Sequence, residues 1–163
     1  IARGLFCFDT VSYVTEASSE IQLNVLLGLL NSGLYDFWFR LTSTNSKVNE
    51  YQFNQLPCVA FQEVDDHVDD LIANKDWTTM ILRLENYVSQ GVVPAWTKNV
   101  IAALVRKIHK AEKKRVLTRR SERSSLSEKG ARHQRRLDKV IYTLFGLDKS
   151  QQQYIATRLE SMD

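Results

Sequence analysis

"LNSGLYDFWFRLTS", residues 30–43, joins two apolar patterns of helical period through a short polar link. Gly33 permits a turn or a kink at Asn31-Ser32-Gly33, because glycine adopts backbone conformations that other residues avoid. After this link, four large apolar side chains recur at the spacing of one helix face: Leu34, Phe37, Trp38 and Leu41. We therefore predict a second helix over about 34–41, with this stripe in the core.

The residues before this link predict a hairpin followed by a helix. In "LFCFDTVSYV", residues 5–14, aromatic and β-branched residues flank Asp9-Thr10, which is typical of two short strands. Ser19 can cap a helix, with Gln22 three positions later. Apolar residues at helical spacing then predict a helix over about 20–31.

The residues after the second helix change abruptly in character. Residues 42–55, "TSTNSKVNEYQFNQ", are polar, and "LPCVAF" at 56–61 follows as an expected strand after a proline-marked turn. The hairpin, the two helices and this strand predict an α+β fold class, with a small sheet and packed helices over residues 1–62.

The rest of the chain predicts a helical subdomain over residues 63–163. Its apolar residues follow the helical period in five segments, at about 63–74, 76–90, 95–117, 134–145 and 149–161. Gly146 follows the apolar stripe of the fourth segment, where a helix C-cap is expected.

Charge is concentrated in one segment of the chain. The net charge is +3, yet residues 106–136 contain 13 Lys and Arg against 3 Glu. That leaves 9 of the 22 basic and 16 of the 19 acidic residues for the rest, a balance of −7. The basic segment is either a mobile segment or a solvated helical arm, and its charge suits either phosphate contacts or simple exposure to solvent.

Catalytic and metal-binding motifs are scarce. "DDHVDD", residues 65–70, could hold a metal in a hydrolase site through Asp65, Asp66, His67 and Asp70, but acidic residues also gather in the first turn of ordinary helices. His109 and His133 have no acidic or cysteine partner at ligand spacing, and we assign them no catalytic role. With no Gly-rich phosphate loop, G-x-S-x-G or H-E-x-x-H motif, we expect neither catalytic residues nor a cofactor in this chain.

The composition also bears on the compartment. No apolar run reaches the 18 or so residues of a membrane span, so we expect a protein without a membrane partner. Two isolated cysteines indicate a reduced, cytoplasmic protein. The chain begins at Ile1, and we expect it to be a piece of a longer polypeptide.

Two motifs in order resemble one family. "LLGLLNSGLYDFWFRLTST" at 26–44 and "YQFNQLPCVAF" at 51–61, preceded by "GLFCFDTVSYVTE", are similar to the core of target-recognition domains in restriction-modification proteins. The stretch "LDKVIYTLFGLDKSQQQYI", from residue 137, resembles the tail of the same proteins. The tail motif falls on Asp138, Tyr142, Leu144, Phe145, Gly146 and Leu147. The likeness spans residues 5–61 and 137–158; residues 62–136 match no motif of the family.

The resemblance implies the C-terminal part of an adenine-N6 DNA methyltransferase or of a fused type IIG restriction enzyme. Such a part would recognise a double-stranded DNA sequence, while an upstream catalytic domain of the same polypeptide would bind S-adenosylmethionine. Asn and Gln suit adenine edges, whereas Arg and Lys suit guanine and phosphates. The candidates for base or groove contacts are Arg40, Thr44, Asn45, Lys47, Asn49 and Gln52. The candidates for phosphate contacts are Lys113, Lys114, Arg115, Arg119, Arg120, Arg123, Arg132, Arg135 and Arg136.

An alternative of another class remains open. The same chain could be a helical protein-docking module whose basic segment meets an acidic partner. The polar stretch 42–53 would then be an ordinary surface loop.

Overall fold

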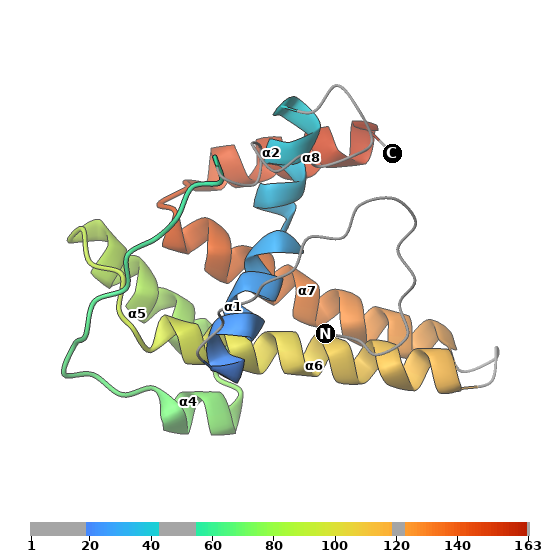
Figure 1. Ribbon diagram of the computed structural model, residues 1–163, viewed down its shortest axis with the longest axis horizontal. Coiled ribbons are helices and arrows are strands. Elements are labelled where there is room, and N and C mark those ends of the chain that lie inside the picture. Colours follow the sequence, from blue (N-terminus) through green and yellow to red (C-terminus); the bar gives the residue numbers. More distant parts are fainter. Residues whose placement is uncertain (1–18, 43–54, 119–122, 163) are drawn as a thin grey trace.

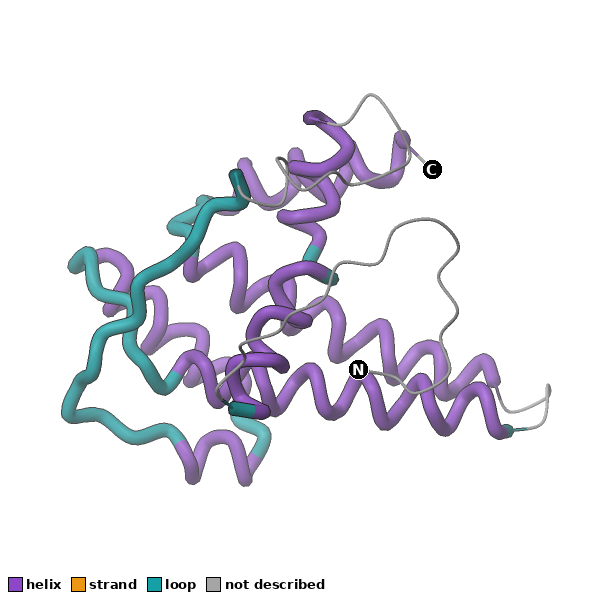
Figure 2. The backbone as a smooth tube through the Cα atoms, viewed as in Figure 1, coloured by secondary structure: helices purple, strands orange, loops and turns teal. Residues whose placement is uncertain are grey.

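A computed structural model describes residues 19–42, 55–118 and 123–162 of the chain, and these residues are helical with connecting loops (Figures 1 and 2). The helices are α1 (Glu20–Leu30), α2 (Gly33–Thr42), α4 (Asp69–Asn74), α5 (Trp77–Ser89), α6 (Thr97–Leu117), α7 (Arg123–Leu144) and α8 (Lys149–Met162). The long helices α6 and α7 lie side by side and run in opposite directions. Helix α1 packs on α6, α5 packs on α7, and α2 packs on α8.

The predicted α+β fold class is wrong, because the described residues contain no strand. The expected strand at 56–61 is a loop in which partly buried Val59 and Phe61 alternate with exposed Cys58 and Ala60. Val59 and Phe61 pack against a helical core, and none of the residues that the structure describes forms a strand beside them. Alternation thus indicates that every second side chain is buried. An extended loop on a core shows this pattern as readily as a strand of a sheet does.

One β-bridge closes this loop against the rest of the chain. The Gln62 N–H donates to the Val93 carbonyl at 2.8 Å, and the Ala95 N–H donates to the Gln62 carbonyl at 2.7 Å. The predicted hairpin at 5–14 lies outside the described residues. The proposed boundary between 62 and 63 stays a prediction.

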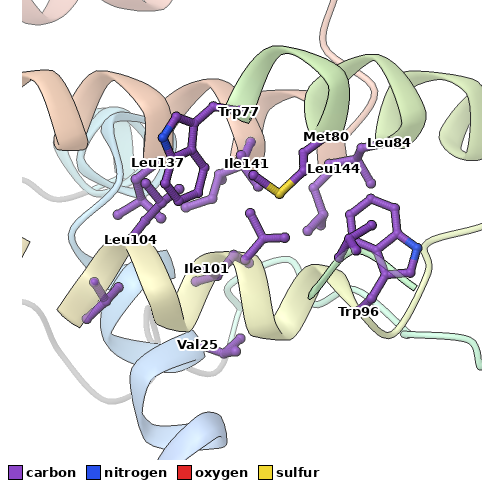
Figure 3. Packing of buried hydrophobic residues seen from close by; sticks show 14 residues of the cluster. Val25, Trp77, Met80, Leu84, Trp96, Ile101, Leu104, Leu137, Ile141 and Leu144 are labelled. Atoms are coloured by element: carbon purple, nitrogen blue, oxygen red, sulfur yellow. The ribbon is translucent and has the colours of Figure 1, made fainter. Parts of the chain in front are cut away.

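The seam between α6 and α7 contains the centre of the core (Figure 3). Val100, Ile101 and Leu104 on α6 recur at helical spacing and are almost fully buried. Leu137 and Ile141 meet them from α7, as the apolar stripes of both segments predict. Helix α7 then ends where expected, since Gly146 has a φ of 68° and its N–H donates to the Thr143 carbonyl at 2.9 Å.

Helix α7 begins eleven residues earlier than the sequence predicts, at Arg123 instead of about 134. Helix α6 continues to Leu117. Apart from residues 118–122, the basic segment 106–136 is thus the outer half of the α6–α7 pair. Of the two forms considered from the sequence, the described part takes that of a helical arm. This arm is formed by α6 and α7, which pack against each other along one seam.

Helix α1 crosses α6 at Gly28. A Cβ placed on Gly28 would lie 2.7 Å from Cγ2 of Ile101 and 3.0 Å from Cγ2 of Val105. Both neighbours are β-branched and stiff, so the helices can approach this closely only because residue 28 has no side chain. The crossing fixes where α1 ends and the link to α2 begins.

The Asn31-Ser32-Gly33 link is fastened to α7. The Gly33 N–H donates to Oδ1 of Asp138 at 2.9 Å, and the side chain of Gln134 donates to the Asn31 carbonyl at 2.9 Å. Ser32 is fully buried; its hydroxyl accepts from the Tyr35 N–H at 3.3 Å and so caps α2. Helix α2 therefore starts at a fixed point on α7.

The buried face of α2 differs from the predicted stripe. Tyr35 is the buried residue, with its ring centroid 6.2 Å from that of Phe145, whereas Trp38 is 37% and Leu41 is 56% exposed. The prediction that Trp38 and Leu41 belong to the core is wrong. Among the described helices α2 packs on α1, α7 and α8, and these contacts leave Trp38 and Leu41 exposed.

Two helical glycines should respond to alanine in opposite directions. Gly28→Ala should destabilise the protein by about 1–3 kcal/mol, because the new methyl group overlaps stiff side chains of α6. Gly130→Ala meets only the flexible end of Glu112, at 3.1 Å, and should stabilise it by about 0.5–1 kcal/mol through helix propensity. Urea unfolding of both variants measures the difference. A stable Gly28→Ala variant would contradict the close crossing of α1 and α6.

Candidate functional site

Basic side chains from both long helices meet on one face of the α6–α7 pair. On α6, Lys107, Lys110 and Lys114 follow each other at i, i+3 and i+7, and on α7, Lys129, His133 and Arg136 lie at i, i+4 and i+7. Each set forms one helical stripe. We call these six residues together with Lys75, which follows α4, the basic face.

Part of this face is concave. A hollow of about 410 Å³ is lined by Lys75, Lys107, Lys110, Ala111, Lys114, Leu126, Lys129 and His133, and we call it the basic hollow. Ala111 is buried, and a Cβ placed on Gly130 would lie 3.9 Å from the Cβ of Ala111. Small residues therefore face each other across the seam here. The longer lysine side chains stand around them.

An aromatic ring supports two of the cations. The Lys107 ammonium lies 4.4 Å from the centroid of the Trp77 ring, and the Arg136 guanidinium lies 5.7 Å from it. Trp77 is only 5% exposed, so these are partly desolvated cation–π contacts. Helix α5 thus positions one cation from α6 and one from α7.

The lysines of the basic face form no ion pair within the described part of the chain. Within the part of the chain that the structure describes, no carboxylate lies within 4 Å of any of its five lysines. The two nearest glutamates on these helices pair with other residues: Glu112 with Arg115 at 2.7 Å and Glu128 with Arg132 at 3.7 Å. The lysines are therefore left to repel one another.

This repulsion affects the titrating groups of the face. Burial, assisted by Lys75 and Arg136, lowers the pKa of Lys107. Burial also lowers the pKa of His133, and the neighbouring cations Arg136, Lys107, Lys129 and Arg132 lower it further. The Nδ1 atom of His133 is buried and has no hydrogen-bond partner among the described residues. The face is thus electrostatically unfavourable by itself.

Lys75 reaches the hollow from a strained backbone position. Its φ is 60°, in the left-handed region that favours glycine, and its N–H caps the end of α4 by donating to the Ile72 carbonyl at 3.2 Å. Asp76 follows immediately and caps α5 by accepting from the Thr79 N–H at 3.2 Å. Lys75 thus occupies a tight corner between α4 and α5, in a backbone conformation that would be less strained for glycine.

The candidates for phosphate contacts are distributed over several surfaces. Lys114 lines the basic hollow, and Arg136 belongs to the basic face. Lys113 instead lines an apolar groove between α1, α6 and α7, and Arg115 pairs with Glu112. The Arg123 backbone is in the first turn of α7, and its side chain is not described. Arg119 and Arg120 lie outside the described residues.

The candidates for base contacts are mostly outside the described part of the chain. Arg40 lies on α2, where its Nε donates to Oδ1 of Asp36 at 2.9 Å. The remaining five, Thr44, Asn45, Lys47, Asn49 and Gln52, fall within residues 43–54, which the structure does not describe. Their role as base contacts stays a prediction.

Sequence reasoning did not single out Lys75, Lys107, Lys110, Lys129 and His133. The signal for four of them was present, because 107/110/114 and 129/133/136 keep helical spacing. The spacing on α7 indicates a shared face only if the helix includes residue 129, and the structure shows that α7 begins at Arg123. Lys75 gave no such signal, since its neighbours in space are more than thirty residues away.

The acidic stretch 65–70 is not assembled into a metal site. Oδ1 of Asp66 pairs with Nη1 of Arg83 at 3.1 Å, and Asp69 and Asp70 are in the first turn of α4. Among the described residues, no three His, Cys, Asp or Glu side chains are close enough together to hold a metal ion. None of the described helices combines the length and the apolar character that a membrane crossing requires.

Comparison of the chain with family models, with curated proteins and with solved structures found no match. The assignment of a function therefore depends on the described geometry and on the motifs of the sequence.

His133 should make stability depend on pH. Its folded pKa is below the ordinary value of 6.5, so the unfolded chain binds a proton where the folded chain does not. The free energy of unfolding should thus be highest above pH 6.5 and should fall as the pH decreases through the folded pKa. His133→Gln should flatten this decline in urea unfolding between about pH 7.5 and 5. An equal slope in both proteins would contradict the crowding of cations around His133.

Proposed function

We propose that this chain is the part of a restriction-modification protein that recognises a double-stranded DNA sequence. The observation that carries the proposal is the basic face, where cations from α6, α7 and the α4–α5 corner gather and no carboxylate of the described residues lies within 4 Å of the lysines. DNA carries one negative charge per roughly 1.7 Å of its axis, and each phosphate neutralised releases counterions. A face of this kind gains affinity from such a partner.

The contact between the two family-like motifs supports the same proposal. The link at residues 31–33 belongs to the first motif and Asp138 to the second, and the Gly33 N–H joins them. Tyr35 lies against Phe145, and the rings of Phe37 and Tyr154 meet edge to face at 6.0 Å. Motifs that resemble one family in sequence order are thus also neighbours in space. A chance resemblance of two unrelated segments gives no reason for this contact.

The proposal assigns separate tasks to the two ends of the chain. The basic face holds the phosphates, which fixes position without reading sequence. Base reading is assigned to residues 43–54, which directly follow α2. Because α2 is fastened to α7 and packs on α8, its end at Thr42 has a fixed place relative to the basic face. Methyl transfer with S-adenosylmethionine, and any cleavage, is assigned to a catalytic domain elsewhere in the same polypeptide.

A protein-docking module remains the second candidate, and an apolar groove favours it. This groove of about 780 Å³ lies between α1, α6 and α7 and includes Leu27, Val116 and Leu117. Val116 is 65% and Leu117 is 78% exposed, which is unusual for large apolar side chains. In this reading the groove binds the partner and the basic face meets its acidic surface.

Selection from random duplex DNA tests the proposal. The 163-residue chain is incubated with the pool at low salt, and the retained fraction is sequenced. We expect enrichment of a short motif that contains adenine, because the chain is assigned base reading as well as phosphate contact. Retention without enrichment would remove the sequence-reading task, and absence of retention would favour the docking module.

A further inference from the structure

The basic hollow brings together side chains from three separate elements. Lys107, Lys110 and Lys114 come from α6, Lys129 and His133 from α7, and Lys75 from the corner between α4 and α5. Each ammonium group offers three hydrogen-bond donors and no acceptor. The residues that line the hollow are therefore mostly cationic, and the methylene groups of the lysines, together with Ala111 and Leu126, make most of its surface apolar.

The fold holds these like charges together at a cost. The seam of α6 and α7 and the Trp77 ring hold Lys107 where burial, and then the charges of Lys75 and Arg136, lower its pKa and disfavour its protonated form. No carboxylate of the described residues relieves the five lysines. An anion in the hollow would add an attraction to each of these cations and so offset their mutual repulsion.

The shape separates this hollow from the rest of the basic surface. Lys113 and Lys149 lie on other surfaces, whereas Lys75, Lys110, Lys114 and Lys129 share one hollow, although each of these four is exposed as well. In the hollow, Lys107 and His133 are partly buried, and Nδ1 of His133 has no partner within the described residues. An imidazole in this place can donate to an anion once it is protonated.

We propose that the basic hollow is a binding site for consecutive phosphate groups of a single polyanion, held by Lys107, Lys110 and Lys129 with Lys75 and Lys114 at its edge. Several lysines around one concavity suit a ligand with several negative oxygens. A single carboxylate would satisfy only a fraction of the donors. The identity of the polyanion as one strand of duplex DNA rests on the proposed function, whereas free polyphosphate has the same chemistry.

Paired triple variants test the site. Lys107→Gln, Lys110→Gln and Lys129→Gln are combined in the hollow variant, and Lys98→Gln, Lys149→Gln and Arg158→Gln in a control that loses the same charge outside the hollow. Both are compared with the unchanged chain by thermal unfolding with inorganic tripolyphosphate, against sodium chloride of equal ionic strength. Their affinity for duplex DNA is then measured across a range of salt concentrations.

We expect tripolyphosphate to raise the unfolding temperature of the unchanged chain and of the control, and to leave that of the hollow variant unchanged. The slope of log affinity against log salt should decrease by about 2 to 3 in the hollow variant, because each lost phosphate contact removes about 0.9. Without any anion, the hollow variant should unfold at a temperature at least as high as the unchanged chain, since repulsion is relieved. The unfolding temperature measured without an anion also shows that the variant folds.

Two outcomes would overturn the site. If the unchanged chain binds DNA and the hollow variant keeps the same salt slope, the hollow does not hold phosphates, although the proposed function survives. If tripolyphosphate stabilises all three proteins equally or none of them, there is no phosphate site in the hollow. Stabilisation that depends on the hollow, in a chain that does not bind duplex DNA, would instead support the site with free polyphosphate as ligand and reject the proposed function.

Discussion

The packing of α6 against α7 is the constraint on which the other elements depend. Ile101, Leu104 and Ile141 are completely or almost completely buried along this seam, and each such side chain contributes about 1.5–3 kcal/mol by leaving water. Helix α1 packs on one side of the pair, α5 packs on the other helix, and the link before α2 is bonded to Asp138 of α7. The pair thus serves as a common frame for elements that are far apart in sequence.

The same two helices continue beyond the core as the carriers of the basic face. Their inner halves present apolar stripes to each other, while toward the outer end the seam narrows to Ala111 and Gly130 and the stripes beside it become lysines. Burial and the charges of Lys75 and Arg136 lower the pKa of Lys107, and the apolar seam offsets this unfavourable arrangement. The frame that stabilises the fold therefore also holds a cluster that an anion would stabilise.

Sequence patterns predicted what local periodicity controls. The stripe at Leu137, Val140 and Ile141 and the cap at Gly146 were predicted correctly, because helix faces and caps depend on near neighbours. The strand at 56–61 was wrong, since alternation indicates burial and does not supply a pairing partner. Trp38 and Leu41 were wrongly placed in the core because periodicity cannot say how many sides of a helix are covered.

The sequence predicted the positive charge of the candidate site but not which residues form it. The excess of cations over 106–136 was evident, yet the choice of Lys107, Lys110 and Lys129 required the register of two helices, and Lys75 required the whole fold.

Lysine acetylation read by mass spectrometry, with and without duplex DNA, tests the central claim most directly. The account predicts protection of Lys75, Lys107, Lys110, Lys114 and Lys129, with Lys98, Lys139 and Lys149 still reactive; unchanged reactivity in the first group, or protection confined to the second, would contradict it.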